Sequence, residues 1–426
     1  MAEHPVRLTV TDDLRRSRLT IFFRLLLAIP HMIWWWLWTI AALVAAVVNW
    51  VATLVTGRSP AALHRFLSAY IRYVTHFFAY LTLAANPYPG FVGDRGYPVD
   101  VEVGEREPQR RWVTALRIFL LIPVLLLSTA FEGTGFPFWY GDKEQGSFAW
   151  GGGGTLLTVA FLGWFACLAL GRMPHGFRDL QVYGLRFMAQ GAAYGLVLTD
   201  RYPNVDPAAT PASGPDHPVR LNVEDDLRRS RLTVFFRLLL ALPHFIWLVL
   251  WWVVTFFAAF ITWIATVIIG RPPAPLHRFL SAFLRYSTHV TAYVALTANP
   301  FPGFTGRAGS YPVDPALPPP ERQRRLVTLF RLFLWIPALL VAGSLNALVF
   351  IGGFLGWFAS LALGRMPRSL REAQAYALRY SAQSSAYLLL ITDRYPYSGP
   401  ALGSPEPESA PEPPAEPPPA EAPAPV

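Results

Sequence analysis

The chain has 426 residues, of which 53% are hydrophobic and 15% are charged, and its net charge is +9 at pH 7. Soluble domains carry about 25% charged residues, so this composition excludes an ordinary soluble domain. In a membrane protein, an excess of basic over acidic residues usually reflects the orientation of the chain in the membrane and contact with anionic lipid, rather than contact with nucleic acid.

The chain opens with a polar segment rather than with an apolar leader. Acidic residues and arginines precede the first apolar run, which is unlike a cleaved signal peptide. Val6, Leu8 and Val10 alternate with period two, which predicts a short strand outside the bilayer. Segments of the same kind recur at residues 99–103, 219–223 and 311–317.

A long apolar run follows the first strand. No charged side chain occurs between Leu25 and Thr56, and the same holds for residues 238–269. Runs of more than about 18 apolar residues are typical of membrane-embedded helices. A single helix over residues 19–56 would be about 57 Å long, whereas the hydrocarbon core is about 30 Å thick. We therefore predict a hairpin of two helices, with a re-entrant pair or one bent helix as alternatives.

An insertion at residues 132–154 favours the hairpin. It carries Asp142, Lys143 and Glu144 and four consecutive glycines, and it divides the second apolar run into two flanks. A helix in lipid must keep all of its backbone hydrogen bonds, so an insertion is tolerated at a loop rather than inside a helix. The insertion therefore predicts the tip of a hairpin.

A second type of helix follows each apolar run. Within residues 63–85 the side chains of Arg65, Arg72 and His76 share one face, and the other faces are rich in aromatic residues. A narrow polar stripe on such a helix predicts an amphipathic helix at the membrane interface. The Asn-Pro pair that follows ends the helix, because proline cannot continue it.

The chain repeats itself at two levels. The segment HPVRLTVTDDLRRSRLT at His4 returns as HPVRLNVEDDLRRSRLT at His217, so the two halves are a tandem duplication. Each half is itself doubled, because a Gly-Arg pair is followed in every quarter by a proline, an arginine, a tyrosine and a second proline at fixed spacings. These pairs begin at Gly57, Gly171, Gly270 and Gly364. The pattern predicts four copies of one helical unit.

The repeats predict an all-α integral membrane protein. Each unit is expected to contain an apolar helix hairpin and an amphipathic interfacial helix, with short strands outside the bilayer. The linker is rich in proline, alanine and serine, and the C-terminal segment has the composition of a disordered tail. The predicted boundaries are units at 1–92, 93–203, 217–305 and 306–397, an inserted loop at 132–154, a linker at 204–216 and a tail at 398–426.

Charge placement predicts an orientation. The inserted tip carries a net negative charge, whereas arginines cluster at the opposite ends of the apolar runs. By the positive-inside rule these arginine-rich ends are cytoplasmic. We therefore expect eight crossings of the plasma (cell inner) membrane, with both termini in the cytoplasm.

The repeated segments resemble a known family. GRSPAALHRF, GRMPHGFRDL, AAYGLVLTDRYP and SAYLLLITDRYP are similar to segments of bacterial membrane proteins catalogued as domain of unknown function 4389. The resemblance implies tandem copies of an apolar helix, a Gly-Arg turn and an amphipathic helix over nearly the whole chain outside the linker, insertion and tail. Units one and three depart from it, with Ala-Asn-Pro in place of Thr-Asp-Arg. The resemblance implies no activity.

One arginine in each third helix is the leading candidate for a binding residue. A guanidinium at the interface can bind a lipid headgroup or phosphate, and the alternative is a structural arginine that fixes the packing of the units. The candidates are Arg72, Arg186, Arg285 and Arg379. Another arginine lies near the start of each apolar run. Its position there predicts that its side chain extends to the membrane surface, that is, that it snorkels. This second set is Arg24, Arg117, Arg237 and Arg331.

Opposite charges at equivalent positions predict contacts between neighbouring units. Eight residues after the repeated glycine, the odd units carry arginine and the even units carry a carboxylate. We expect inter-repeat pairing among Arg65, Asp179, Arg278 and Glu372.

Catalytic and metal-binding patterns are missing from the sequence. There is no G-x-S-x-G, Walker loop or H-E-x-x-H segment. The single cysteine, Cys167, lies in an apolar helix and is predicted to be a small buried hydrophobic residue. We therefore expect no enzyme activity, cofactor, metal site or nucleic-acid partner. The predicted function is a lipid-contacting scaffold or accessory subunit, with anionic membrane lipids as partners. Because internal repeats with broken helices are typical of transporters, a transporter or channel is the alternative.

Overall fold

The computed structural model describes residues 4–133, 154–210 and 217–400. Within these ranges the chain is mostly helical, and the same order of a short helix, a long apolar helix and a 21-residue helix recurs along it. The first half contains β1 (Val6–Val10), α1 (Arg18–Phe22), α2 (Arg24–Thr56), α3 (Ala61–Leu81), β2 (Val99–Val103), α4 (Arg111–Ala115), α5 (Arg117–Glu132), α6 (Thr155–Leu170) and α7 (His175–Gly195). After the 3-10 turn η1 (Pro207–Ala209), the second half contains β3 (Arg220–Val223), α8 (Arg231–Phe235), α9 (Arg237–Ile269), α10 (Ala274–Val294), β4 (Val313–Ala316), α11 (Arg325–Leu329), α12 (Arg331–Leu363) and α13 (Arg368–Leu388).

The first, third and fourth apolar runs are single helices, so the hairpins predicted for them are wrong. Helices α2, α9 and α12 each continue for 33 residues and end at a glycine in the left-handed conformation. The glycines inside α12 serve close packing rather than a turn. A Cβ atom on Gly352 would lie 3.0 Å from Gln374 Cγ, and one on Gly356 would lie 2.7 Å from Met366 Cε. Within the described residues three helices are thus long and apolar enough to cross a membrane, rather than the eight crossings that we predicted.

The insertion interrupts a helix instead of capping a hairpin. Helices α5 and α6 have 16 residues each and meet end to end, because Gly154 lies directly beside Gly133. The hydroxyl of Thr155 donates to the carbonyl of Ala130 at 2.8 Å across the junction. The pair therefore takes the place of one long helix. The predicted tip residues Asp142, Lys143 and Glu144 lie outside the described residues.

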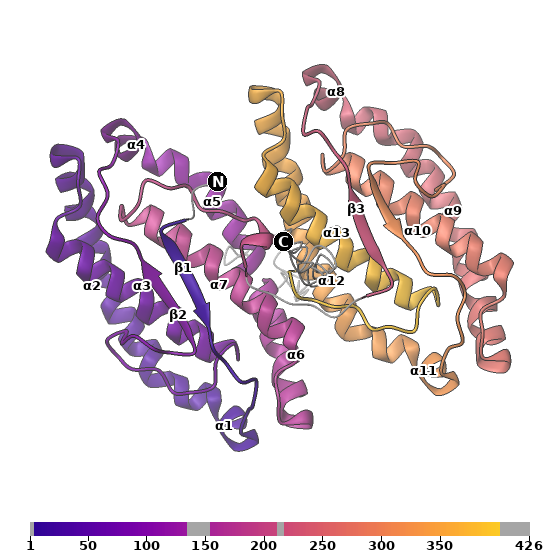
Figure 1. The fold of residues 1–426 in the computed structure, drawn as a ribbon, viewed down its shortest axis with the longest axis horizontal. Helices are drawn as coiled ribbons and strands as arrows, with labels where there is room; N and C mark the ends of the chain where they lie inside the picture. The colour runs from indigo at the N-terminus through magenta and orange to yellow at the C-terminus, as the bar shows by residue number, and fades with distance from the viewer. Residues whose placement is uncertain (1–3, 134–153, 211–216, 401–426) are drawn as a thin grey trace, which may run out of the picture.

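The elements form three layers. Two antiparallel two-stranded sheets, β1–β2 and β3–β4, pack on the 21-residue helices α3, α7, α10 and α13. The long helices α2, α5–α6, α12 and α9 pack on the same four helices. The 21-residue helices therefore form a middle layer, with the strands in front of them in Figure 1.

The two halves meet at the centre of the molecule. Helix α12 packs against α5 and α6, and the rings of Tyr183 and Tyr376 meet edge to face at 5.6 Å. Figure 1 shows α1 at the lower end of one half and its counterpart α8 at the upper end of the other. The halves thus point in opposite directions while both present their strands to the same side.

Candidate functional site

A buried arginine joins each long helix to the end of its neighbouring middle helix. Arg24 Nη1 donates to the carbonyl of Tyr80 at 2.9 Å, and its guanidinium carbon lies 4.2 Å from the centre of the Tyr80 ring. Arg331 Nη1 likewise donates to the carbonyl of Tyr387 at 2.6 Å and stacks on that ring. The same contacts join Arg117 to Tyr194 and Arg237 to Tyr293. We call each pair a clamp.

The clamps place positive charge at the negative end of a helix dipole. A helix C-terminus leaves backbone carbonyls without intrahelical donors, and a guanidinium can serve several of them at once. Arg331 reaches Thr392 O at 3.0 Å and Asp393 Oδ1 at 2.9 Å in addition to Tyr387. The Arg331 side chain is buried, with only 1% of its surface exposed. The predicted snorkelling of these arginines to the surface is therefore wrong.

The backbone beyond each clamp is held in a strained conformation. The second residue after the end of the middle helix has a positive φ although it is not glycine, as for Leu83 (φ 67°) and Leu390 (φ 61°). Such a conformation is costly for a branched side chain. A side chain binds the exposed carbonyl in each case, since Arg16 donates to Leu83 O at 3.0 Å and Gln323 to Leu390 O at 2.6 Å.

The candidate arginines of the middle helices bind backbone rather than facing lipid. Arg72 Nε donates to the carbonyl of Val101 on β2 at 3.1 Å. Arg186 donates to the carbonyls of Asn204 and Asp206, Arg285 to Pro315, and Arg379 to Tyr397 and Gly399. Each arginine therefore ties a middle helix to the strand or loop that covers it. This geometry supports the structural alternative over headgroup binding.

A histidine–aspartate pair joins the middle helix to the sheet in both halves. His76 Nε2 lies 2.8 Å from Asp100 Oδ1, and His289 Nε2 lies 2.7 Å from Asp314 Oδ1. Burial lowers the pKa of His76, although Asp100 acts in the opposite direction. The polar stripe of α3 is thus covered by a strand, whereas we predicted lipid headgroups there.

The residues predicted to pair between units have other partners. Asp179 accepts from Arg178 Nε at 2.7 Å and from the Tyr397 hydroxyl at 2.7 Å. Glu372 pairs with Arg371 on its own helix. Arg65 and Arg278 are exposed at the start of their helices. Asp179 nevertheless connects the two halves, because Tyr397 belongs to the end of the second one.

The surface of the long helices is apolar and exposed. On α2 a single stripe that includes Ala28, His31 and Ala42 is buried, and most of the remaining side chains are exposed. The exposed side chains are large and apolar, and Phe350 on α12 is 79% exposed. Contiguous apolar surface of this extent marks contact with a membrane or another protein.

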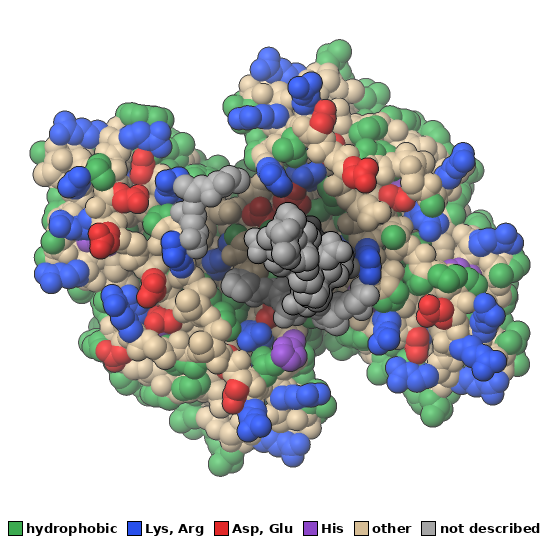
Figure 2. Space-filling model, viewed as in Figure 1, with side chains coloured by type: hydrophobic (Ala, Val, Ile, Leu, Met, Phe, Trp, Pro, Cys, Tyr) green, Lys and Arg blue, Asp and Glu red, His purple; other side chains and the backbone are tan. Residues whose placement is uncertain are grey.

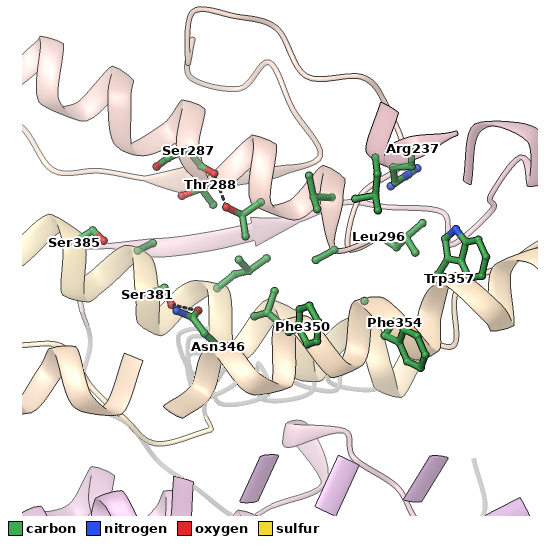
Figure 3. A pocket seen from close by; sticks show the side chains of 18 of the residues that line it. Arg237, Ser287, Thr288, Leu296, Asn346, Phe350, Phe354, Trp357, Ser381 and Ser385 are labelled. Atoms are coloured by element: carbon green, nitrogen blue, oxygen red, sulfur yellow. Dashed lines mark hydrogen bonds between the residues drawn. The ribbon is translucent and has the colours of Figure 1, made fainter. Parts of the chain in front are cut away.

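A groove in the second half opens beside these apolar side chains. It has a volume of about 760 Å³ and lies between α10, α12 and α13 (Figure 3). Arg237 and Trp357 lie at one end and Ser385 at the other. The walls are largely apolar, and the polar groups are neutral except for the clamped arginine. The polar lining residues other than Arg237 and Trp357 are Ser287, Thr288, Thr291, Asn346, Ser381 and Ser385.

The first half carries bulkier and less polar side chains at two of the positions that line this groove. Thr291 corresponds to Phe78 and Ser381 to Met188 in the duplicated sequence. The Thr291 hydroxyl donates to the carbonyl of Ser287 at 2.8 Å, so it is hydrogen-bonded within its own helix. Our sequence reasoning missed this site, although a comparison of polar with apolar residues at equivalent positions of the two halves would have indicated it.

A match to a protein-family profile identifies the family of this chain. The profile described as Domain of unknown function (DUF4389) matches residues 18–93, 231–305 and 325–398. The chain belongs to this family. Each DUF4389 match begins at or beside a short helix and ends after a middle helix, and the clamps of Arg24, Arg237 and Arg331 lie within the matches. No curated protein and no solved structure matches the chain.

The second quarter of the sequence has no DUF4389 match, although the resemblance in sequence extended to it. It nevertheless has the same elements, with α4 followed by the interrupted α5–α6 pair and α7. The Arg117–Tyr194 clamp is present as well.

Proposed function

We propose that this DUF4389 protein is a non-enzymatic membrane component, a scaffold or accessory subunit that works in contact with lipid. The observation that carries the proposal is the apolar exposed surface of α2, α9 and α12, each 33 residues long. The buried arginines support it, because their guanidiniums are occupied by backbone carbonyls. We further infer that residues 93–203, of which the family matches cover only residue 93, are a fourth copy of the unit, interrupted by an insertion.

Lipid contact and anionic preference can be tested together. Exposed arginines at the ends of the long helices, such as Arg58 and Arg111, are suited to bind anionic headgroups. We expect anionic lipid to be enriched in nanodiscs formed directly from cell membranes, as measured by lipid mass spectrometry. The enrichment should fall in the variant Arg58→Gln/Arg111→Gln.

The matched control is Arg95→Gln/Arg307→Gln, which removes two exposed arginines from loops of the strand layer. It should leave the enrichment unchanged. Release of the wild-type protein by alkaline carbonate, or the same lipid profile in both variants, would contradict the proposal.

A transporter or channel is the second candidate, and the groove between α10, α12 and α13 favours it. Thr291→Phe/Ser381→Met introduces the side chains of the first half and should fill the groove without disturbing the fold. Loss of a solute flux in proteoliposomes on this change would support transport. Under the scaffold proposal we expect no protein-dependent flux in either protein, with unchanged thermal unfolding.

A further inference from the structure

The contacts between α2 and α3 establish which parts of the two helices lie level with each other. His31 Nδ1 lies 3.0 Å from the Tyr73 hydroxyl, and the Thr39 hydroxyl lies 2.9 Å from the Tyr70 hydroxyl. Residues 70–73 of α3 are therefore level with residues 31–39 of α2, which reach from its N-terminal part to just before its middle.

The sheet lies at the same level. Arg72 donates to Val101 O, and His76 contacts Asp100, so β2 crosses α3 beside the N-terminal half of α2. The sheet extends to the middle of α2, because Val6 and Val101 belong to the same buried cluster as Ala42. Two-stranded sheets leave backbone groups unpaired along both edges. The sheet also carries exposed charged side chains at Arg7 and Glu102. Figure 2 shows acidic and basic side chains spread across the face that carries the strands.

A crossing orientation of α2 would therefore bring the sheet to the centre of the bilayer. Open sheet edges do not occur in contact with hydrocarbon, because the backbone groups there find no hydrogen-bond partners. Charged side chains at that depth are unfavourable as well, because they lose their hydration without gaining a partner in the lipid. The second half has the same geometry, with Asp314 on β4 bound to His289 in the middle layer.

The ends of the long helices exclude a crossing orientation for a second reason. Exposed arginines flank α2 at both ends, as Arg18 before it and Arg58 after it. A helix that crosses once would place one of these arginine-rich ends outside the cell, against the positive-inside rule. Both ends lie on one side only if the helix runs along the membrane.

We infer that the protein is monotopic, with its long helices parallel to the membrane surface in one leaflet and its strand layer in water. A helix layer about 10 Å thick fits the acyl region of one leaflet, which is about half of the 30 Å core. Because both halves present their strands to the same side, both immerse the same face (Figure 1).

A tryptophan on the side of each of α2 and α9 lies at the predicted boundary between hydrocarbon and water. Trp34 on α2 donates through Nε1 to the carbonyl of Phe91 at 2.7 Å, and Trp247 on α9 donates to Phe304 at 3.0 Å. Both partners belong to loops that lead to a strand. Tryptophan is enriched where hydrocarbon meets water. Its position along the side of α2 and α9 agrees with helices that lie flat.

The inference rests on the proposed lipid contact and is tested by the depth of three positions on one side of α2. Leu26, Ile40 and Val55 are exposed at the start, middle and end of the helix, and the helical period places them on the same side. Each is replaced by cysteine in a Cys167→Ser background and labelled with a fluorophore. The protein is then reconstituted in vesicles whose lipids carry nitroxide quenchers at defined depths.

We expect the three labels to have equal depth within one leaflet. We also expect Ser17→Cys and Arg58→Cys, at opposite ends of α2, to react with an impermeant maleimide from the same side of sealed membrane vesicles. A deep label at Ile40 between two shallow ones, with Ser17→Cys and Arg58→Cys reacting from opposite sides, would overturn the inference. If no lipid-borne quencher reached any label, the proposed lipid contact itself would fail. Leu239, Val253 and Ile268 of α9 provide the same test in the second half.

Discussion

Replacement of Arg331 by methionine is expected to lower the free energy of unfolding by about 3 kcal/mol. The arginine is 1% exposed and binds the carbonyls of Tyr387 and Thr392 and the carboxylate of Asp393. Methionine fills similar space but leaves these acceptors without a donor in a buried setting. Thermal unfolding in detergent, followed by tryptophan fluorescence, measures the change.

Arg324 supplies a matched control for this prediction. It donates to the same Asp393 carboxylate at 3.2 Å, but its side chain is 76% exposed. Exposed ion pairs contribute about 0–1 kcal/mol, so Arg324→Gln should have little effect. Arg331→Lys keeps the charge and loses the planar fork, and it should fall between the two. Equal stability of Arg331→Met and Arg324→Gln would show that the clamp does not stabilise the fold.

Substitution of Gly306 by alanine is expected to destabilise the second half by about 3 kcal/mol or more. Gly306 has φ +59°, and an added Cβ would lie 2.0 Å from the carbonyl oxygen of Ala282 on α10. That contact involves helix backbone, which cannot move without breaking the middle layer. Gly309 in the same loop has φ +69° but open space around it.

The Gly309→Ala variant therefore distinguishes the cost of the left-handed backbone conformation from the cost of the steric clash with α10. It should cost only the left-handed penalty of about 1 kcal/mol. Denaturation in detergent for the two variants side by side measures the difference. If Gly309→Ala lowered the free energy of unfolding as much as Gly306→Ala, the loss would come from the left-handed backbone conformation and not from the close contact with α10.

The groove gives the two halves different surfaces on the same scaffold. Thr291 and Ser381 stand where the first half has Phe78 and Met188, so one half carries bulky apolar side chains at positions where the other has hydroxyls. If the long helices lie in one leaflet, the groove opens beside apolar side chains such as Phe350 that face acyl chains rather than bulk water. A molecule dissolved in the leaflet would then reach it laterally.

The sequence by itself determined the DUF4389 family and the presence of helices apolar enough to cross a membrane, and it marked the arginines and tyrosines of the clamps as repeated residues. Composition and the length of the apolar runs are sufficient to predict such helices, because no soluble core needs such runs. The repeated spacing of arginine, glycine and tyrosine showed that every unit has residues equivalent to Arg24 and Tyr80. The spacing could not show that these two side chains are in contact. Their contact depends on α3 running back along α2, which the Gly57 turn makes.

Only the tertiary structure decided the number of helices and the environment of the polar residues. The length of the apolar run allowed a hairpin, a re-entrant pair or one bent helix. The structure has one continuous helix, and the backbone first turns at Gly57, where α2 ends. The polar stripe with Arg72 and His76 fits lipid headgroups and a protein partner equally well in sequence. The partner is β2, and pairing between strands distant in sequence determines its position, because Val6 on β1 faces Val103 on β2.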